Sequence, residues 1–462
     1  MMRKTFSHST LALAALCLLV VFSSCSGNDY VNVMPANSTA VLAVDMAASQ
    51  QESRDNQQSN PLMKWLNLQD VGDCGLDLSA KLYFFETADG NIGALAKVND
   101  EGDLKSWLGE LSKHNVCQPT KSYKDFQFTV VKDSWLLGYS NHACLVMGPF
   151  LPAQHAEARR QMAKYLAQEE EEEDGIQATP LFERLSALEG QVTLVGQTAA
   201  LPQQFVAPFI LGAPADAEPS QVMLAASFSK SVDGILEING ESFSFNEKLN
   251  QQLTDNKKML KPIQGKYLHC LSSDAVMGLF LNVEGKSFID ILHQNKPLQA
   301  LLAGVNTAID MDNIIRSVQG DMMLALTSYQ GEDMSLQMAA QLADAKFLDD
   351  VDYWKQSCPA GSRITDWQPQ AYCLTNGSTS YYFGVSNDKQ YYSGSTRELA
   401  LASIAGAPLS LSSKVLDKVK GQRFSMILNV NALLGAFSAA PMVKSLTAPL
   451  LGEVNTVIIN IK

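Results

Sequence analysis

The pattern of apolar and polar positions predicts two similar series of strands and helices along the chain. Ser38–Val44 and Ser273–Phe280 are short, largely apolar runs, which are typical of buried strands. Each run is followed by an Asn, Pro and Leu grouping that predicts the start of a helix, at Asn60 and at Asn295. The two series therefore begin with the same pair of elements.

The next elements are also repeated in order. Ala80–Val98 and Asp321–Leu342 each predict a pair of strands, with turns at residues 89–91 and 330–332. A helix is then expected in both series, because apolar residues recur at a spacing of three and four. These residues are Leu104, Trp107, Leu108 and Leu111 in the first series and Phe347, Leu348, Val351 and Trp354 in the second.

Four further matches complete the parallel. They are Cys117 with Cys358 at the end of that helix, the hairpins Phe126–Val146 and Thr379–Gly394, the segments Leu185–Gly196 and Leu416–Asn429, and the segments Pro208–Ser227 and Pro441–Ile461. Two unrelated α+β domains would not preserve this order, so the sequence predicts a tandem duplication.

We place the copies at residues 35–268 and 269–462. The first copy carries an acidic insertion at 168–175, a hairpin at Ser229–Phe245 and a helix near Glu247–Leu260. The short connections favour antiparallel sheets faced by helices, an α+β fold.

The first 24 residues resemble a bacterial lipoprotein signal peptide. Arg3 and Lys4 precede the apolar run Leu11–Phe22, and two small serines precede Cys25. Twelve apolar residues are too few to span a bilayer, which needs roughly 20. We expect cleavage before Cys25, acyl chains such as palmitate on its thiol, and a tether at 25–34. The alternative is an ordinary secretory signal followed by a chance cysteine.

Charge and cysteine content narrow the possible partners. Removing residues 1–24, which hold two basic and no acidic residues, leaves 33 Lys and Arg against 48 Asp and Glu, a net charge of −15. This balance disfavours nucleic acid and anionic lipid surfaces. Export would permit disulfides, and Cys358 with Cys373 is one possible pair among 15 pairings of six cysteines. The alternative is that all six are small buried side chains.

The usual signatures of catalytic and metal sites do not occur in the sequence. The five histidines after the leader share no metal-ligand spacing, and no Cys-x-x-Cys is present, so we expect no metal and no cofactor. The acidic clusters at 169–174, 310–312 and 349–352 do not form a calcium loop, and we expect 169–174 to be a solvated loop. Ser-x-x-Lys pairs at Ser227 and Ser386 lie on strand or turn segments, so we expect no catalytic residue there. The histidines are His114, His142, His155, His269 and His293.

Aromatic residues crowd one predicted hairpin of the second copy. Because alternate residues face opposite sides of a strand, the rings must either face solvent or stack across the pair. Exposed rings could bind sugars or proteins, whereas stacked rings would be structural. The residues are Tyr381, Tyr382, Phe383, Tyr391 and Tyr392.

The opening of the mature chain resembles a known family. Residues 25–30 (Cys-Ser-Gly-Asn-Asp-Tyr), followed by Pro35-Ala36 and the run Ala40-Val41-Leu42-Ala43-Val44-Asp45, are similar to an uncharacterised envelope lipoprotein family of the Bacteroidetes, which is filed as a domain of unknown function. The resemblance implies an envelope lipoprotein made of related halves, and it implies no catalytic residues. Ser26 is compatible with sorting to an outer membrane, and either face of that membrane is possible.

These observations favour a membrane-anchored envelope protein that binds an unknown envelope protein or ligand without catalysis. Two alternatives stay open. A carrier of an apolar molecule would need a cavity between helices and sheet. An envelope hydrolase would need carboxylates such as Asp45 or Glu86 brought together with a histidine in a pocket.

Overall fold

The computed structural model describes residues 29–45, 74–168, 175–214, 216–294, 309–330, 333–377, 379–436 and 453–461. The described chain forms two compact units, which divide between Glu183 and Arg184. The predicted signal peptide, Cys25, the helix starts at Asn60 and Asn295 and the acidic residues 169–174 lie outside the described residues. The division between the two compact units, at 183/184, differs from the boundary at 268/269 that the sequence predicts between the two copies. The boundary between copies stays a prediction.

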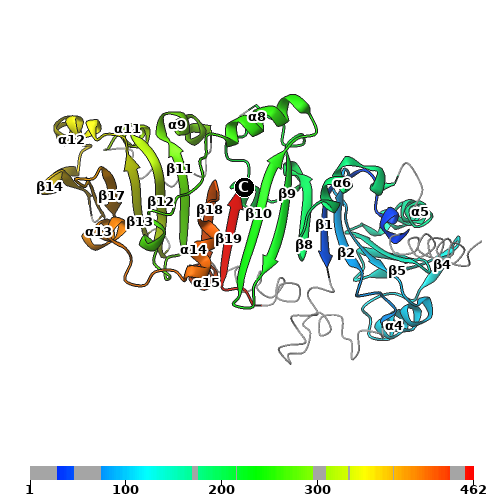
Figure 1. The fold of residues 1–462 in the computed structure, drawn as a ribbon. Helices are drawn as coiled ribbons and strands as arrows, with labels where there is room; N and C mark the ends of the chain where they lie inside the picture. Colours follow the sequence, from blue (N-terminus) through cyan, green and yellow to red (C-terminus); the bar gives the residue numbers. More distant parts are fainter. Residues whose placement is uncertain are drawn as a thin grey trace, which may run out of the picture. The chain divides into compact units, whose positions relative to one another are not determined.

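Unit 1 is an antiparallel sheet with helices on both faces (Figure 1). Its strands are ordered β1-β2-β3-β7-β6-β5-β4. The turn predicted at 89–91 joins β2 to β3, with Gly90 at a positive φ of 76°. The elements are η1 (Asp29–Val33), β1 (Ser38–Asp45), β2 (Lys81–Thr87), β3 (Ile92–Lys97), α4 (Glu101–Lys113), β4 (Lys121–Tyr123), β5 (Phe126–Val131), β6 (Trp135–Tyr139), β7 (Ala143–Gly148), η3 (Pro152–Gln154), α5 (His155–Leu166) and η4 (Ile176–Ala178).

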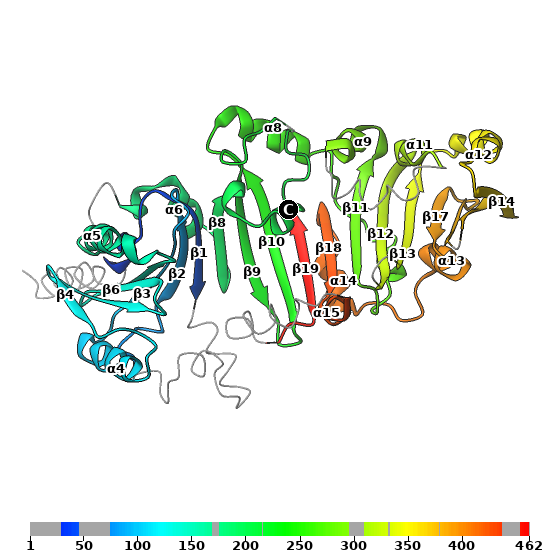
Figure 2. The same ribbon diagram turned by 180° about the vertical axis from the view of Figure 1, so that it is seen from behind.

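The two long helices of unit 1 cover opposite faces of its sheet. Leu104 and Leu108 of α4 pack with Leu137 and Tyr139 of β6. A Cβ on the intervening Gly138 would instead lie 3.1 Å from Leu166 of α5. Because alternate residues of a strand face opposite sides, α4 and α5 must lie on different faces. Figures 1 and 2 show the two helices on opposite sides of β4–β6.

The segment predicted as a tether is partly folded. Tyr30, Val31, Val33 and Met34 are all buried, and the Tyr30 hydroxyl donates a hydrogen bond to the Lys81 carbonyl at 2.8 Å. The tether prediction for 25–34 is therefore wrong for residues 29–34, because this short apolar run packs into the core of unit 1. Residues 25–28 lie outside the described part of the chain.

Unit 2 is a longer sheet with the strand order β8-β9-β10-β19-β18-β11-β12-β13-β17-β16-β15-β14. β10 lies within the hairpin predicted at Ser229–Phe245, but its partner β9 begins at Met223, so only the last two residues of β9 fall in the predicted range. The helix predicted near Glu247–Leu260 forms as α8. The strands are β8 (Val192–Gln197), β9 (Met223–Lys230), β10 (Ile235–Phe243), β11 (Met277–Glu284), β12 (Val318–Gln330), β13 (Asp333–Leu342), β14 (Ser362–Gln368), β15 (Ala371–Asn376), β16 (Thr379–Val385), β17 (Gln390–Gly394), β18 (Phe424–Asn429) and β19 (Thr456–Ile461).

Helices pack against this sheet, and the first four residues of α6 belong to unit 1. Val415, Leu416 and Val419 of α14 form a core with Ile427 of β18 and Ile458 of β19. The helices are α6 (Pro180–Ser186), α7 (Gln203–Val206), α8 (Glu247–Lys257), α9 (Gly285–Gln294), α11 (Met311–Arg316), α12 (Val351–Ser357), α13 (Arg397–Ala405), α14 (Ser413–Val419) and α15 (Val430–Ala436). The protein is thus a mixed α and β fold with a large antiparallel sheet.

One strand pair departs from the expected antiparallel pattern. β10 and β19 run parallel, with Asn239 opposite Asn460. Short connections favour antiparallel pairing only between strands that follow each other in sequence. These two strands are separated by most of the second predicted copy. The sequence patterns also missed β14 and β15, and they gave β5, β6 and β7 as a single hairpin.

Candidate functional site

A row of polar side chains crosses five strands of unit 2. Thr193 of β8 lies opposite Ser227 of β9, Ser227 lies opposite Asn239 of β10, and Asn239 lies opposite Asn460 of β19, which in turn lies opposite Ser425 of β18. Residues directly opposite each other place their side chains on the same face of a sheet. The five side chains therefore form one continuous polar row, in strands that otherwise bury apolar residues.

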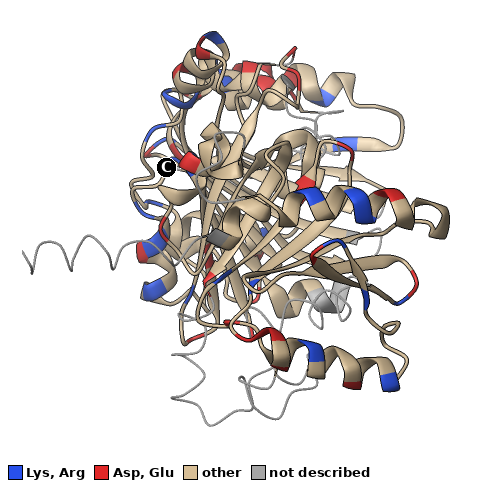
Figure 3. Cartoon of the chain, turned by 90° about the vertical axis from the view of Figure 1, so that its right-hand side faces the viewer, with Lys and Arg blue, Asp and Glu red and all other residues tan. Residues whose placement is uncertain are grey.

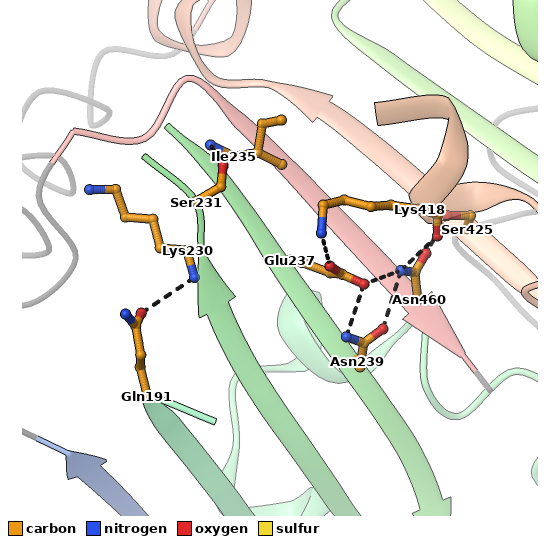
Figure 4. A network of polar contacts seen from close by, with 9 residues as sticks. All are labelled: Gln191, Lys230, Ser231, Ile235, Glu237, Asn239, Lys418, Ser425 and Asn460. Carbon is orange, nitrogen blue, oxygen red and sulfur yellow. Dashed lines mark hydrogen bonds and ion pairs between the residues drawn. The ribbon is translucent and has the colours of Figure 1, made fainter. Parts of the chain in front are cut away.

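Asn460 hydrogen-bonds its neighbours in and around this row (Figure 4). Its side chain is fully buried, and its Nδ2 donates to Asn239 Oδ1 at 3.2 Å, to Glu237 Oε1 at 3.3 Å and to the Lys418 carbonyl at 3.3 Å. Its Oδ1 accepts a hydrogen bond from the Ser425 hydroxyl. The donors and the acceptor of this buried amide are thus all used, as burial of an amide requires.

Glu237 connects the row to α14. Lys418 Nζ forms an ion pair with one carboxylate oxygen, and the other oxygen accepts from Asn239 Nδ2 at 3.0 Å. The Glu237 side chain is only 15% exposed and that of Lys418 is 33% exposed. The lysine neutralises a largely buried carboxylate, so removing either partner would leave an uncompensated charge.

A second ion pair joins the same helix to the same hairpin. Lys414 Nζ lies 2.6 Å from Asp233 Oδ2 in the β9–β10 turn, and the two side chains are 69% and 47% exposed. Exposed pairs of this kind contribute little to stability. Together with the apolar core of α14, β19 and Ile235 of β10, the buried pair and the amides hold α14 and β19 against β10.

Further along the same face of β10, a small cluster surrounds Glu241. Arg184 donates to the Glu241 carboxylate, and its guanidinium lies 5.4 Å from the centre of the Phe243 ring. Lys257 Nζ donates to the Ser242 carbonyl at 2.5 Å and lies 3.8 Å from Glu241 Oε2. Burial lowers the pKa of Lys257, and the nearby Glu241 charge only partly offsets this effect. These groups tie Arg184 and α8 to β10.

Asp321 of β12 holds the chain segment that leads into β11. Its carboxylate accepts backbone hydrogen bonds from Gln264 at 3.0 Å, Gly265 at 2.7 Å and Lys266 at 2.8 Å. Three amide donors satisfy this buried carboxylate without a cation. No local pattern marks Asp321, Glu237 or Asn460 in the sequence, because their partners are distant along the chain.

The structure separates most of the candidate residues taken from the sequence. Cys25 lies outside the described residues, and the possible pair Cys358 and Cys373 does not form a disulfide. Cys373 is buried in β15, where its thiol lies 3.8 Å from the Leu374 carbonyl, whereas Cys358 ends α12 and is partly exposed. Within the described ranges, no three His, Cys, Asp or Glu side chains are grouped closely enough to hold a metal ion.

The histidines have separate local surroundings. His293 Nε2 lies 2.9 Å from Asp312 Oδ2, and His142 Nδ1 lies 3.1 Å from Asn141 Oδ1. Asp310 caps α11 by accepting from the Asn313 amide at 3.0 Å. These residues therefore make local structural contacts.

The aromatic residues of the second predicted copy stack across β15, β16 and β17. Phe383, Tyr391 and Tyr392 are buried, and the Tyr381 hydroxyl contacts the Tyr391 hydroxyl at 3.0 Å and Ser393 Oγ at 2.8 Å. Tyr382 is partly buried against Trp367, with ring centres 5.6 Å apart. The structural interpretation of this cluster is thus the correct one.

Comparison with known proteins identifies the family. The model of a domain of unknown function, DUF4836, matches residues 52–460. The chain belongs to this family. No curated protein matches the DUF4836 chain significantly.

Solved structures give only a distant likeness to the DUF4836 chain. Crystal form IV of TP0453 matches with 12% identity and a TM-score of 0.28, covering 43% of this chain and 75% of that one. Crystal form III matches with 10% identity and a TM-score of 0.27, covering 81% and 97%. Across the described part of the DUF4836 chain, no helix has the length and apolar character needed to cross a membrane.

Proposed function

We propose that this DUF4836 protein is an envelope lipoprotein, held on a membrane by acyl chains at Cys25, and that it acts by binding a partner molecule rather than by catalysis. Its scaffold would be two tandem copies of one α+β unit. The outer membrane is the location that Ser26 favours.

The observation that carries this proposal is the burial of η1 so soon after Cys25. Tyr30, the first residue of the described chain whose burial is known, is buried and follows the cysteine by only five positions. A chain of that length spans at most roughly 18 Å when fully extended. Acylation at Cys25 would therefore hold unit 1 close to the lipid surface. Two or more acyl chains, at roughly 0.8 kcal/mol per buried methylene, make such an anchor stable.

The order of strands supports the proposed duplication. In unit 1 the order β1-β2-β3-β7-β6-β5-β4 is the same, position by position, as β11-β12-β13-β17-β16-β15-β14 in unit 2. A helix follows the third strand in each set, α4 and α12, and another follows the seventh, α5 and α13. Two unrelated domains would not share both the order in the chain and the order in the sheet.

The contacts around Glu237 support binding over catalysis. Its charge is neutralised by Lys418, and its neighbours are the amides of Asn239 and Asn460, which already hydrogen-bond one another. Such groups join elements and can present a rigid surface, and a partner-binding protein needs a rigid frame of this kind.

Metabolic labelling with an alkyne fatty acid tests the anchor. The wild-type protein should carry the label and sediment with membranes, and a Cys25→Ala variant should do neither. Cys17→Ala is a matched control, because that cysteine lies inside the predicted leader and should not alter labelling. A Cys25→Ala variant that still carries the label and still sediments would overturn the proposal.

Affinity capture from solubilised envelopes tests the binding role. The wild-type protein, cross-linked before extraction, should retain one molecule in stoichiometric amount, identified by mass spectrometry. Recovery of the protein without any stoichiometric companion would count against a binding function.

A further inference from the structure

The turn between β7 and α5 exposes an apolar sequence. Residues 149–153 read Pro-Phe-Leu-Pro-Ala, and all except the half-buried Phe150 are exposed. The Leu151 side chain is 69% exposed, and Ile92, which lies opposite Gly148 at the start of β3, is 48% exposed. Single exposed apolar residues are common, but a continuous group at one end of a sheet is typical of an interaction surface.

The helix that follows this turn is basic, although the protein is acidic. α5 carries Arg159, Arg160 and Lys164 against one acidic residue, Glu157. Arg160 pairs with Glu157, whereas Lys164 is exposed. Figure 3 shows all Lys and Arg residues in blue and all Asp and Glu residues in red. On the opposite face of unit 1, α4 has three acidic and two basic residues. The two helices that cover opposite faces of unit 1 therefore differ in charge.

The predicted anchor joins the chain on the face that carries α5. η1 contacts α5, and Figures 1 and 2 show the two side by side. Cys25 is four residues before Asp29, the start of η1, so it lies within roughly 14 Å of that residue whatever the conformation between them. This reach is short compared with the width of a domain.

We infer that the 149–153 turn, with Ile92 and the outward side of α5, is the surface of unit 1 that lies against the lipid bilayer. The inference rests on the proposed acyl anchor at Cys25. The apolar turn would enter the headgroup region while the basic side chains of α5 contact lipid phosphates. The acidic run at 169–174 follows α5 closely in the chain and would be repelled by anionic lipid. The surface therefore fits a zwitterionic phosphatidylcholine or phosphatidylethanolamine membrane.

Hydrogen exchange measured by mass spectrometry tests this orientation. One sample is the full lipidated chain in phosphatidylcholine vesicles, and the other is the unlipidated Cys25→Ser variant in detergent-free solution. Amides of residues 149–166 should exchange severalfold more slowly in the vesicles. Amides of α4, on the opposite face, should exchange at the same rate in both samples and act as an internal control. A Leu151→Asp variant, which changes an exposed side chain, should stay anchored but lose most of the protection at 149–154.

The outcomes separate the two proposals. A lipidated protein that fails to remain with the vesicles contradicts the anchor. A protein that remains with them but shows equal protection on both faces, or protection of α4 alone, contradicts the orientation and leaves the anchor intact. Equal protection in the wild type and in Leu151→Asp would also contradict it, because the apolar turn would then make no contact with lipid.

Discussion

At the scale of single residues, Asn460 shows how a buried polar group can fix a sheet. It sits in an otherwise apolar strand and shares hydrogen bonds with Glu237, Asn239 and Ser425. Replacing Asn460 with Ala should lower the free energy of unfolding by about 2–4 kcal/mol, because several buried partners lose their hydrogen bonds at once.

Urea unfolding measures this effect. Asn431→Ala is the control, because Asn431 is an exposed residue of α15 and should change the unfolding free energy by less than about 0.5 kcal/mol. Equal effects of the two substitutions would show that the polar row adds no stability.

Asp77 provides a test by pH. Burial would raise the pKa of this carboxyl, but hydrogen bonds from the Ser79 side chain and backbone and the charge of Lys97 outweigh burial and lower it. A group whose pKa is lowered by folding stabilises the folded state above its unfolded pKa, near 3.8, and this contribution disappears as the pH falls through the folded value.

Asp77→Asn should therefore reduce stability at pH 7 and make little difference at pH 2. Thermal unfolding at the two pH values checks this, with Asp89→Asn in the exposed β2–β3 turn as the control. A penalty of the same size at both values would mean that the charge of Asp77 is not involved.

At the scale of elements, α14 is held by two lysines of different burial. Lys418 pairs with the largely buried Glu237, and Lys414, one turn earlier, pairs with the exposed Asp233. Lys418→Met should destabilise the protein by about 1–3 kcal/mol, because it leaves the carboxylate without its cation. Lys414→Met should cost less than about 1 kcal/mol.

Hydrogen exchange of β10 and β19 gives a local measure of the same difference. Lys418→Met should speed exchange in both strands, whereas Lys414→Met should leave it near the wild-type rate. If Lys414→Met speeds exchange and Lys418→Met does not, α14 is held mainly by its contact with the β9–β10 turn.

Local patterns predicted elements whose side chains follow a clear period. The apolar face of Leu104 and Leu108 gave α4, and the turn at Gly90 gave the β2–β3 hairpin. They failed for β14, where exposed and buried positions do not alternate regularly, and for η1, a short apolar run read as a tether. The parallel pairing of β10 with β19 depends on contacts between distant parts of the chain, which a local pattern does not contain.

The polar contacts were the least predictable part of the candidate site. No local sequence motif marks Asn460 or Asp321. Both are buried and hydrogen-bond partners that are distant along the chain. In contrast, the anchor at Cys25 is predicted from a local motif of consecutive residues. It stays a prediction, because Cys25 lies outside the described residues.

At the scale of the whole molecule, the proposed function depends on the N-terminus being attached to lipid. The family match gives membership of DUF4836 without a biochemical role, so the anchor is the part of the proposal with the most direct consequence. Attachment would set which surface of unit 1 faces the membrane and which surfaces are available to a partner.

Mass spectrometry of the N-terminal peptide, from protein purified out of native membranes, tests this claim most directly. We predict a peptide that begins at Cys25 and carries diacylglycerol, with no peptide from residues 1–24. A mature chain that begins elsewhere, or a Cys25 thiol without acyl groups, would contradict it.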